Sequence, residues 1–212
     1  YENAEKIILC LSGFISAIGT VMLPKVSRMT RMKQMDAVQR HIRLSMELVM
    51  CMVCAMAFGL AAVAVNFAPL FYGDDFAYSG TLMMPLAFTL LSIGFANVIR
   101  TQWVLPQGRD TIFVHSVLTG AVINLIANFV LIPPLGAMGA AAATVLAEFS
   151  VPAVQFVYLR KELPYAHYLK TTGVYCLFGL VMAGVVALLG HVLPLHGWGK
   201  LAVQVIGGAA VY

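Results

Sequence analysis

The stretch IFVHSVLTGAVINLIANFVLIPPLGAMGAAAATVLAEFSVPAVQFVYLR, residues 112–160, decides the fold class of this chain. It contains two apolar segments, 112–132 and 136–159, each close to the roughly 20 residues that a helix needs to cross the hydrocarbon core of a bilayer. Two amides and a carboxyl stand inside these segments, at Asn124, Asn128 and Glu148. At that depth an unpartnered amide or carboxyl costs on the order of several kcal/mol, so such groups face a helix interface or a water-filled path. Membrane transport is therefore the first hypothesis.

The composition extends this interpretation to the whole chain. Hydrophobic residues make up 61% of the 212 positions and charged residues only 10%, whereas soluble domains carry about 25% charged residues. No strand-like alternation is present, so the segments are expected to be helices, which satisfy their own backbone groups in lipid. The sequence predicts an all-α polytopic transmembrane helix bundle of about seven helices. The predicted spans are 7–24, 46–72, 81–105, 112–132, 136–159 and 171–193, with a seventh that begins near 201 and is cut short.

The chain is expected to be part of a longer protein. It begins with Tyr1 rather than Met and shows no signal-peptide pattern, and its seventh apolar segment has only about a dozen residues before Tyr212. Function is therefore expected to be shared with a portion outside this sequence.

Lysine and arginine residues predict the orientation. They concentrate in the connections 25–45, 106–111 and 160–170, which the positive-inside rule places in the cytoplasm. The intervening connections carry few cations, and the first of them carries Asp74 and Asp75. The net charge of +4 thus reflects membrane topology. Nucleic-acid binding is not predicted, because it needs a basic face on a soluble domain.

The connection 25–45 has a helical pattern of its own. Apolar residues recur at spacings of three and four, with cations between them, which predicts an amphipathic helix lying on the membrane surface. The apolar positions are Met29, Met32, Met35, Val38 and Ile42. We expect this segment to anchor to anionic lipid without contacting substrate.

Signatures of enzymatic chemistry are absent from the sequence. There is no nucleophile elbow, P-loop or dinucleotide-binding turn. Cys51 and Cys54 have the spacing of a metal or redox motif, but no second pair or histidine cluster accompanies them, so we interpret them as small buried residues. No catalytic residue, metal or cofactor is predicted.

Four motifs follow one another in order at the ends of the spans, and the last is the strongest. They are LPKVS at 23–27, LFYGDDF at 70–76, LPQGR at 105–109 and NLIANFVLIP at 124–133. Together these motifs resemble those of bacterial polysaccharide flippases of the O-antigen type, in the multidrug/oligosaccharidyl-lipid/polysaccharide exporter superfamily. The chain is similar to the C-terminal half of such a flippase.

The resemblance implies a transporter of two six-helix lobes with the substrate cavity between them. On this mapping residues 1–170 are the C-terminal lobe without its first helix, and 171–212 are a truncated additional helix pair. Such proteins move a polyprenyl-pyrophosphate-linked oligosaccharide across the bacterial inner membrane by alternating access. The implied partners are this lipid-linked substrate, the bilayer, a coupling H⁺ or Na⁺ and other polysaccharide assembly proteins.

A wet, hydrogen-bonding and cationic path is needed to carry a pyrophosphate-linked sugar through hydrocarbon. In the first span Ser12 and Ser16, followed by Thr20, form a polar stripe on one helical face, and Lys6 lies near its external end. The same small residues would equally serve close helix packing.

Arg100 is the candidate contact for the substrate phosphate, because a guanidinium binds phosphate through paired hydrogen bonds. Flippases of this type tend to have a small residue here, so the cation departs from the pattern and the resemblance gives it no role. The alternative is a side chain that snorkels to the cytoplasmic headgroups. Asn97 and Gln102 are its expected hydrogen-bonding neighbours.

Glu148 is expected near mid-membrane, where it either couples an ion to transport or is a neutral carboxyl that bonds a neighbouring helix. Asn124 and Asn128 are expected to lock helices together, and Gly136 and Gly139 to allow close packing.

The predicted function is translocation of lipid-linked oligosaccharide. A cation-coupled multidrug exporter of the same superfamily is one alternative, and a membrane-embedded glycan polymerase or ligase is another. The sugar identity, the coupling ion and the oligomeric state do not follow from the sequence.

Overall fold

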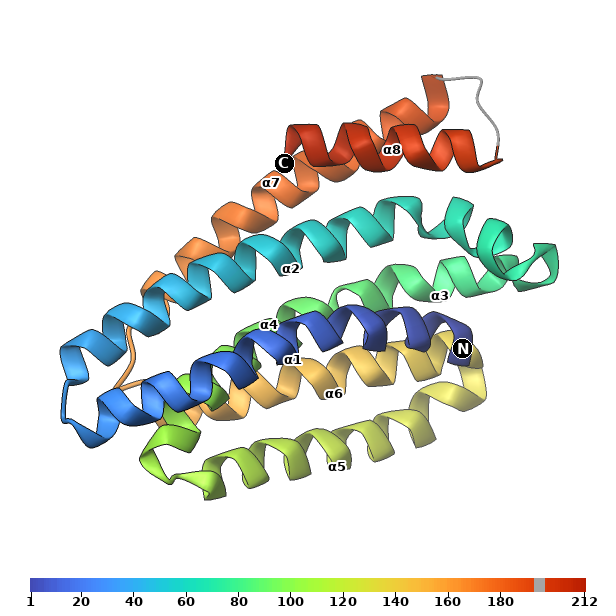
Figure 1. The fold of residues 1–212 in the computed structure, drawn as a ribbon. Helices are drawn as coiled ribbons and strands as arrows, with labels where there is room; N and C mark the ends of the chain where they lie inside the picture. The colour runs from blue at the N-terminus through green and yellow to red at the C-terminus, as the bar shows by residue number, and fades with distance from the viewer. Residues whose placement is uncertain (193–196) are drawn as a thin grey trace.

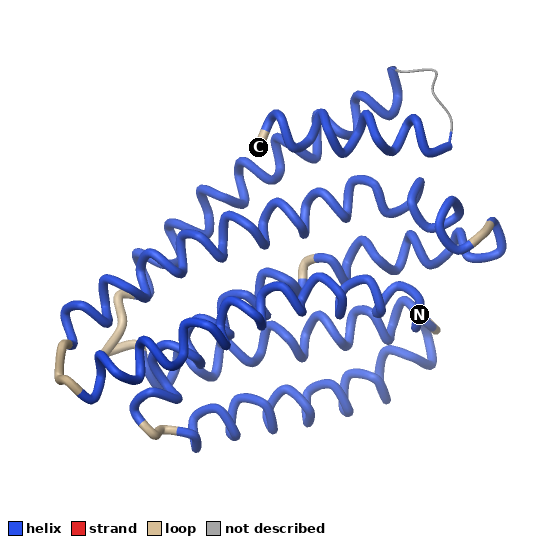
Figure 2. The backbone as a smooth tube through the Cα atoms, viewed as in Figure 1, coloured by secondary structure: helices blue, strands red, loops and turns tan. Residues whose placement is uncertain are grey.

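The computed structural model describes residues 1–192 and 197–212, and the described residues form a bundle of helices without strands (Figures 1 and 2). The elements are α1 (Glu2–Arg31), α2 (Met35–Tyr72), η1 (Asp74–Phe76), α3 (Ala77–Ala87), α4 (Thr89–Ile99), η2 (Arg100–Val104), η3 (Leu105–Gln107), α5 (Asp110–Leu135), α6 (Ala137–Leu159), α7 (Tyr165–Val192) and α8 (Gly197–Val211). Six segments are long and apolar enough to cross a membrane. The chain is therefore an all-α, multi-pass membrane protein, as predicted. The predicted end of the sixth span at residue 193 lies outside the described residues.

The span from Asp74 to Gln107 differs from the others in two ways. Of the residues in its most apolar stretch, 72% are buried, against 39% or less in the other five spans. This span therefore lies at the centre of the bundle. It is also interrupted, by a break at Phe88 between α3 and α4 and by a π-helical turn in η2. A π-turn shifts the direction of the side chains that follow it and is frequent at functional sites.

The prediction of a separate amphipathic surface helix over 25–45 is wrong. α1 continues to Arg31, and α2 begins at Met35 after a short turn. Val38 and Ile42 are fully buried in the core of the bundle. The ends of α1 and α2 place apolar residues every three to four positions because one face of each helix packs against the bundle. A helix lying on a membrane surface shows the same spacing of apolar residues.

α5 and α6 form a tightly packed hairpin. Gly136 has φ +57° at the turn, where L side chains are strained, and a Cβ on Gly139 would lie 2.1 Å from the Leu131 carbonyl oxygen. Ala141 and Ala143 are buried nearby. The predicted close-packing role is confirmed for Gly139 and wrong for Gly136, where a Cβ would meet nothing within 4 Å and the glycine instead serves the positive φ of the turn.

The helices are arranged so that α2 separates two groups. α1, α3, α4, α5 and α6 lie on one side of α2, and the pair α7–α8 lies on the other (Figure 1). The connections at 32–34, 108–109 and 160–164 all lie at one end of the bundle (Figure 2). The three cation-rich connections thus share one end, as the predicted topology requires.

Candidate functional site

A cavity of about 490 Å³ lies between α1, α4, α5 and α6. We call it the polar cavity, because polar side chains from five elements, α1, α4, η2, α5 and α6, gather in it although its helices are apolar. Small and apolar residues, among them Gly120, Ala121 and Val117, form the rest of its wall. The polar residues are Ser16, Asn97, Arg100, Asn124, Glu148 and Gln155.

Arg100 is held in place by neutral groups. It begins the π-helical turn that follows α4, and its Nη2 donates to Asn97 Oδ1 at 2.9 Å. Its guanidinium carbon lies 5.1 Å from the centroid of the Phe113 ring, a cation–π distance. Its Nε is buried without a partner, and no carboxylate among the described residues pairs with it. The side chain lines the cavity and retains donors that an anion can accept.

Asn97 connects Arg100 to the first helix. Its Nδ2 donates to the Ile15 carbonyl of α1 at 2.8 Å while its Oδ1 accepts from Arg100. Gly19 makes room for this amide, because a Cβ there would lie 2.9 Å from both side-chain polar atoms. The predicted neighbour of Arg100 is therefore in place, and it fixes both the guanidinium and the adjacent α1.

Glu148 faces the same cavity from α6. Its backbone carbonyl accepts a hydrogen bond from the Ser92 hydroxyl of α4, which ties the two helices together. Within the described part of the chain its carboxyl forms no ion pair. The interhelical bond that was expected of this residue is made by its backbone, and the carboxyl itself is left facing the cavity.

Gln155 is a cavity residue that sequence reasoning missed. It is 1% exposed, and neither polar atom of its side chain has a partner in the described structure. It lies seven residues after Glu148 on α6, and residues seven apart share one face of a helix. That spacing was the signal available in the sequence.

Four predicted residues lie outside the polar cavity. Ser12 donates to the Leu9 carbonyl within α1, and Lys6 pairs with Glu2 at 2.8 Å on the exposed start of that helix. Gln102 is 1% exposed, with no partner among the described residues and no contact with the cavity.

Asn128 is the fourth of these, and it donates to Asn124 Oδ1 at 2.7 Å. This bond joins neighbouring turns of α5, as the spacing of four residues favours. The expected lock between helices is not formed by the two amides within the described structure, and Asn124 instead lines the cavity.

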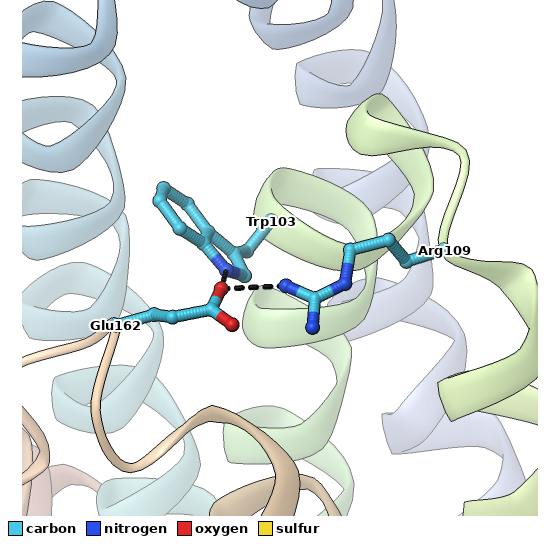
Figure 3. A network of polar contacts seen from close by, with 3 residues as sticks. All are labelled: Trp103, Arg109 and Glu162. Carbon is cyan, nitrogen blue, oxygen red and sulfur yellow. Dashed lines mark hydrogen bonds and ion pairs between the residues drawn. The ribbon is translucent and has the colours of Figure 1, made fainter.

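A second arginine, Arg109, belongs to a paired cluster at the cation-rich end. Its Nη1 donates to Glu162 Oε2 at 2.5 Å, and Trp103 Nε1 donates to the same oxygen at 3.1 Å (Figure 3). The hydrogen bond from Arg109 holds the pKa of Glu162 below its ordinary value. This Trp103–Arg109–Glu162 cluster fastens the connection between α6 and α7 to the region around η2 and η3.

Comparison with known proteins shows what the chain is similar to. The family model described as "Lipid II flippase MurJ" matches residues 1–206. A protein of Haloferax volcanii named as a low-salt glycan biosynthesis flippase, Agl15, is 23% identical over 100% of this chain and 45% of its own length. A protein of Shigella dysenteriae named as an O-antigen transporter is 22% identical over 66% of this chain and 34% of its own length. The chain spans less than half the length of these relatives.

Proposed function

The chain belongs to the lipid II flippase MurJ family, and from this we propose that the protein containing it moves a polyprenyl-pyrophosphate-linked oligosaccharide across the membrane by alternating access. Family membership makes the chain part of a transporter rather than an enzyme. The names of the two relatives refer to glycan and O-antigen transport, which supports a lipid-linked glycan as the substrate class.

The polar cavity is the observation that carries this proposal. A pyrophosphate-linked sugar needs hydrogen-bonding groups in place of water while it passes the hydrocarbon core. Within the described structure, Arg100 offers a guanidinium that forms no ion pair, and Gln155 offers an amide without a partner. Arg100 binds the phosphate groups, and Gln155, Asn124 and Ser16 contact the sugar or its bridging waters.

Glu148 is proposed as the residue that couples an ion to transport. Its carboxyl lies in the cavity with Arg100 but is paired with no cation in the described structure. A charged carboxylate within a membrane span is costly, and binding of a proton or Na⁺ neutralises it. Binding of H⁺ or Na⁺ here would alter the charge of the cavity that holds the phosphate.

The orientation is proposed from the shared location of the cation-rich connections. With these connections in the cytoplasm, Arg100 lies in the cytoplasmic half of the bundle, where the substrate enters. We place the protein in the plasma membrane, which is the inner membrane of a bacterium, beside other polysaccharide assembly proteins.

The test uses the full-length protein in liposomes and follows a fluorescent polyprenyl-pyrophosphate oligosaccharide into the far leaflet. Transport well above that of empty liposomes is expected. Efflux of small cationic dyes with no glycolipid movement would contradict the proposal and favour the multidrug exporter.

A further inference from the structure

A second hollow, which we call the apolar groove, lies between α2, α4, α6 and α7 and has a volume of about 420 Å³. It occupies a different face of α6 from the polar cavity: Phe149, Ala153 and Phe156 line the groove, whereas Glu148 and Gln155 line the cavity. Its rim is open, since Phe149, Phe156 and Leu169 are 43%, 39% and 57% exposed. In a membrane an open apolar rim faces lipid.

The groove has the length of one leaflet. On α7 it runs from Tyr165, next to the connection 160–164, to Cys176. The eleven helical steps from Tyr165 to Cys176 correspond to about 16 Å of helix, close to half of the roughly 30 Å hydrocarbon core. One acyl chain of a bilayer lipid fits this length, whereas a polyprenyl chain exceeds it.

The mouth of the groove offers a hydrogen-bond donor. Tyr165 is 4% exposed, and its hydroxyl has no partner in the described part of the chain. Its ring is fixed edge-on against Phe156, with centroids 5.0 Å apart. A buried hydroxyl without a partner is costly, and a lipid ester carbonyl would satisfy it.

Positive charge surrounds this mouth. Arg160 and Lys161 are exposed on the connection that leads into Tyr165, and neither forms an ion pair among the described residues. Glu162, the carboxylate of that connection, is already paired with Arg109. An anionic headgroup at the surface would therefore meet two unneutralised cations.

We propose that the apolar groove binds an anionic phospholipid of the cytoplasmic leaflet. One acyl chain lies between α6 and α7, an ester carbonyl accepts from the Tyr165 hydroxyl, and the phosphate contacts Arg160 and Lys161. The bound lipid fills the space between α7 and the lobe formed by α4 and α6. The inference rests on the orientation proposed above and does not depend on transport.

The test measures labelling of the purified full-length protein by phosphatidylglycerol that carries a photoactivatable group in its acyl chain. Labelled peptides are expected from α6 and α7 at the groove. Ala153→Trp, which fills the groove, should reduce labelling more than tenfold. Tyr165→Phe should weaken lipid retention about fivefold through loss of one hydrogen bond. Leu177→Trp is the matched control, because Leu177 lies on α7 with 60% exposure and outside the groove.

Three results would overturn the inference: labelling that Ala153→Trp leaves unchanged, equal retention of phosphatidylcholine, or displacement of the phospholipid by polyprenyl phosphate. The last would assign the groove to the substrate tail. Because the readout is lipid labelling, its failure is distinguishable from failure of the proposed transport, which the liposome assay reports.

Discussion

Arg100 and Arg109 lie nine residues apart and have opposite environments. Arg109 is paired with Glu162 at the surface, in a cluster completed by Trp103 (Figure 3). Arg100 is half-buried and faces a cavity, and its hydrogen-bond and cation–π partners among the described residues, Asn97 and Phe113, are both neutral. A partly buried cation that lacks a carboxylate partner costs free energy unless an anionic ligand neutralises it. The difference separates an arginine that holds two connections together from one that is available to an anionic ligand.

Replacing Arg100 should have the largest effect on substrate binding. Arg100→Ala removes charge-assisted hydrogen bonds that contribute about 1.5–3 kcal/mol, so affinity for a polyprenyl-pyrophosphate oligosaccharide should fall roughly tenfold to a hundredfold. Binding to the full-length protein in detergent measures this. Arg109→Ala is the matched control and should leave affinity within about twofold, since its charge is neutralised by Glu162. An equal loss in both variants would erase the distinction between the two arginines.

Glu148→Gln should remove the response of transport to an ion gradient. The wild type is expected to move substrate faster when a proton or Na⁺ gradient is imposed across the liposome, and the variant should not respond. Glu162→Gln, a carboxylate outside the cavity, should respond as the wild type does. If transport by the Glu148→Gln variant still speeds up when the gradient is imposed, the cavity carboxyl has a structural role and not an ion-coupling one.

Gln155→Met should stabilise the protein and weaken binding at the same time. Removing two buried, unpartnered polar atoms raises the free energy of unfolding by about 1 kcal/mol, which thermal unfolding in detergent detects. Affinity for the substrate should fall about fivefold, because one hydrogen bond is lost. Gln102→Met is the control: its amide is equally buried and has no partner among the described residues, but it lies outside the cavity. It should stabilise without changing affinity, and an affinity loss there would argue against a cavity-specific role.

Disrupting the Trp103–Arg109–Glu162 cluster should have the smallest effect of these changes. The effect should be on the stability of the protein and not on transport. Both partners are about one-third exposed, so the ion pair contributes less than about 1 kcal/mol. The pKa of Glu162 is lower in the folded protein than in the unfolded chain. Its contribution is therefore complete above the unfolded pKa and lost as pH falls through the folded pKa.

Thermal unfolding over a series of acidic pH values tests this, with Glu162→Gln for comparison. The variant should show a shallower loss of stability with acid than the wild type. Identical pH profiles would mean that the cluster contributes nothing measurable.

Much of the fold could be predicted because lipid permits few structures. Spans of about 20 apolar residues have to be helical, and the cations marked one end of the bundle. The prediction for 25–45 fails because two structures give the same spacing of apolar residues. One is a helix end packed on a core, and the other is a helix lying on a membrane surface. The break at Phe88 and the π-turn at Arg100 depend on tertiary packing, which overrides local pattern.

The candidate site was predicted only in part, for a similar reason. Arg100, Asn97 and Glu148 were singled out because charge and amides are rare in apolar spans, and the fold brings them to one cavity. Ser12 and Lys6 lie on the same helix as Ser16, but only Ser16 of these three lines the cavity. Gln155 was not predicted, because the sequence does not show that its side chain is buried at the cavity.

The most direct test of substrate binding in the polar cavity places a photo-crosslinking residue, p-benzoylphenylalanine, at Val117 or at Leu118 of the full-length protein in cells. The two positions are adjacent on α5 and similarly exposed, at 44% and 57%, but only Val117 lines the polar cavity. If the polar cavity holds the substrate, lipid-linked oligosaccharide is captured at Val117 and not at Leu118. Capture at both positions, or at Leu118 alone, would contradict the claim that the cavity holds the substrate.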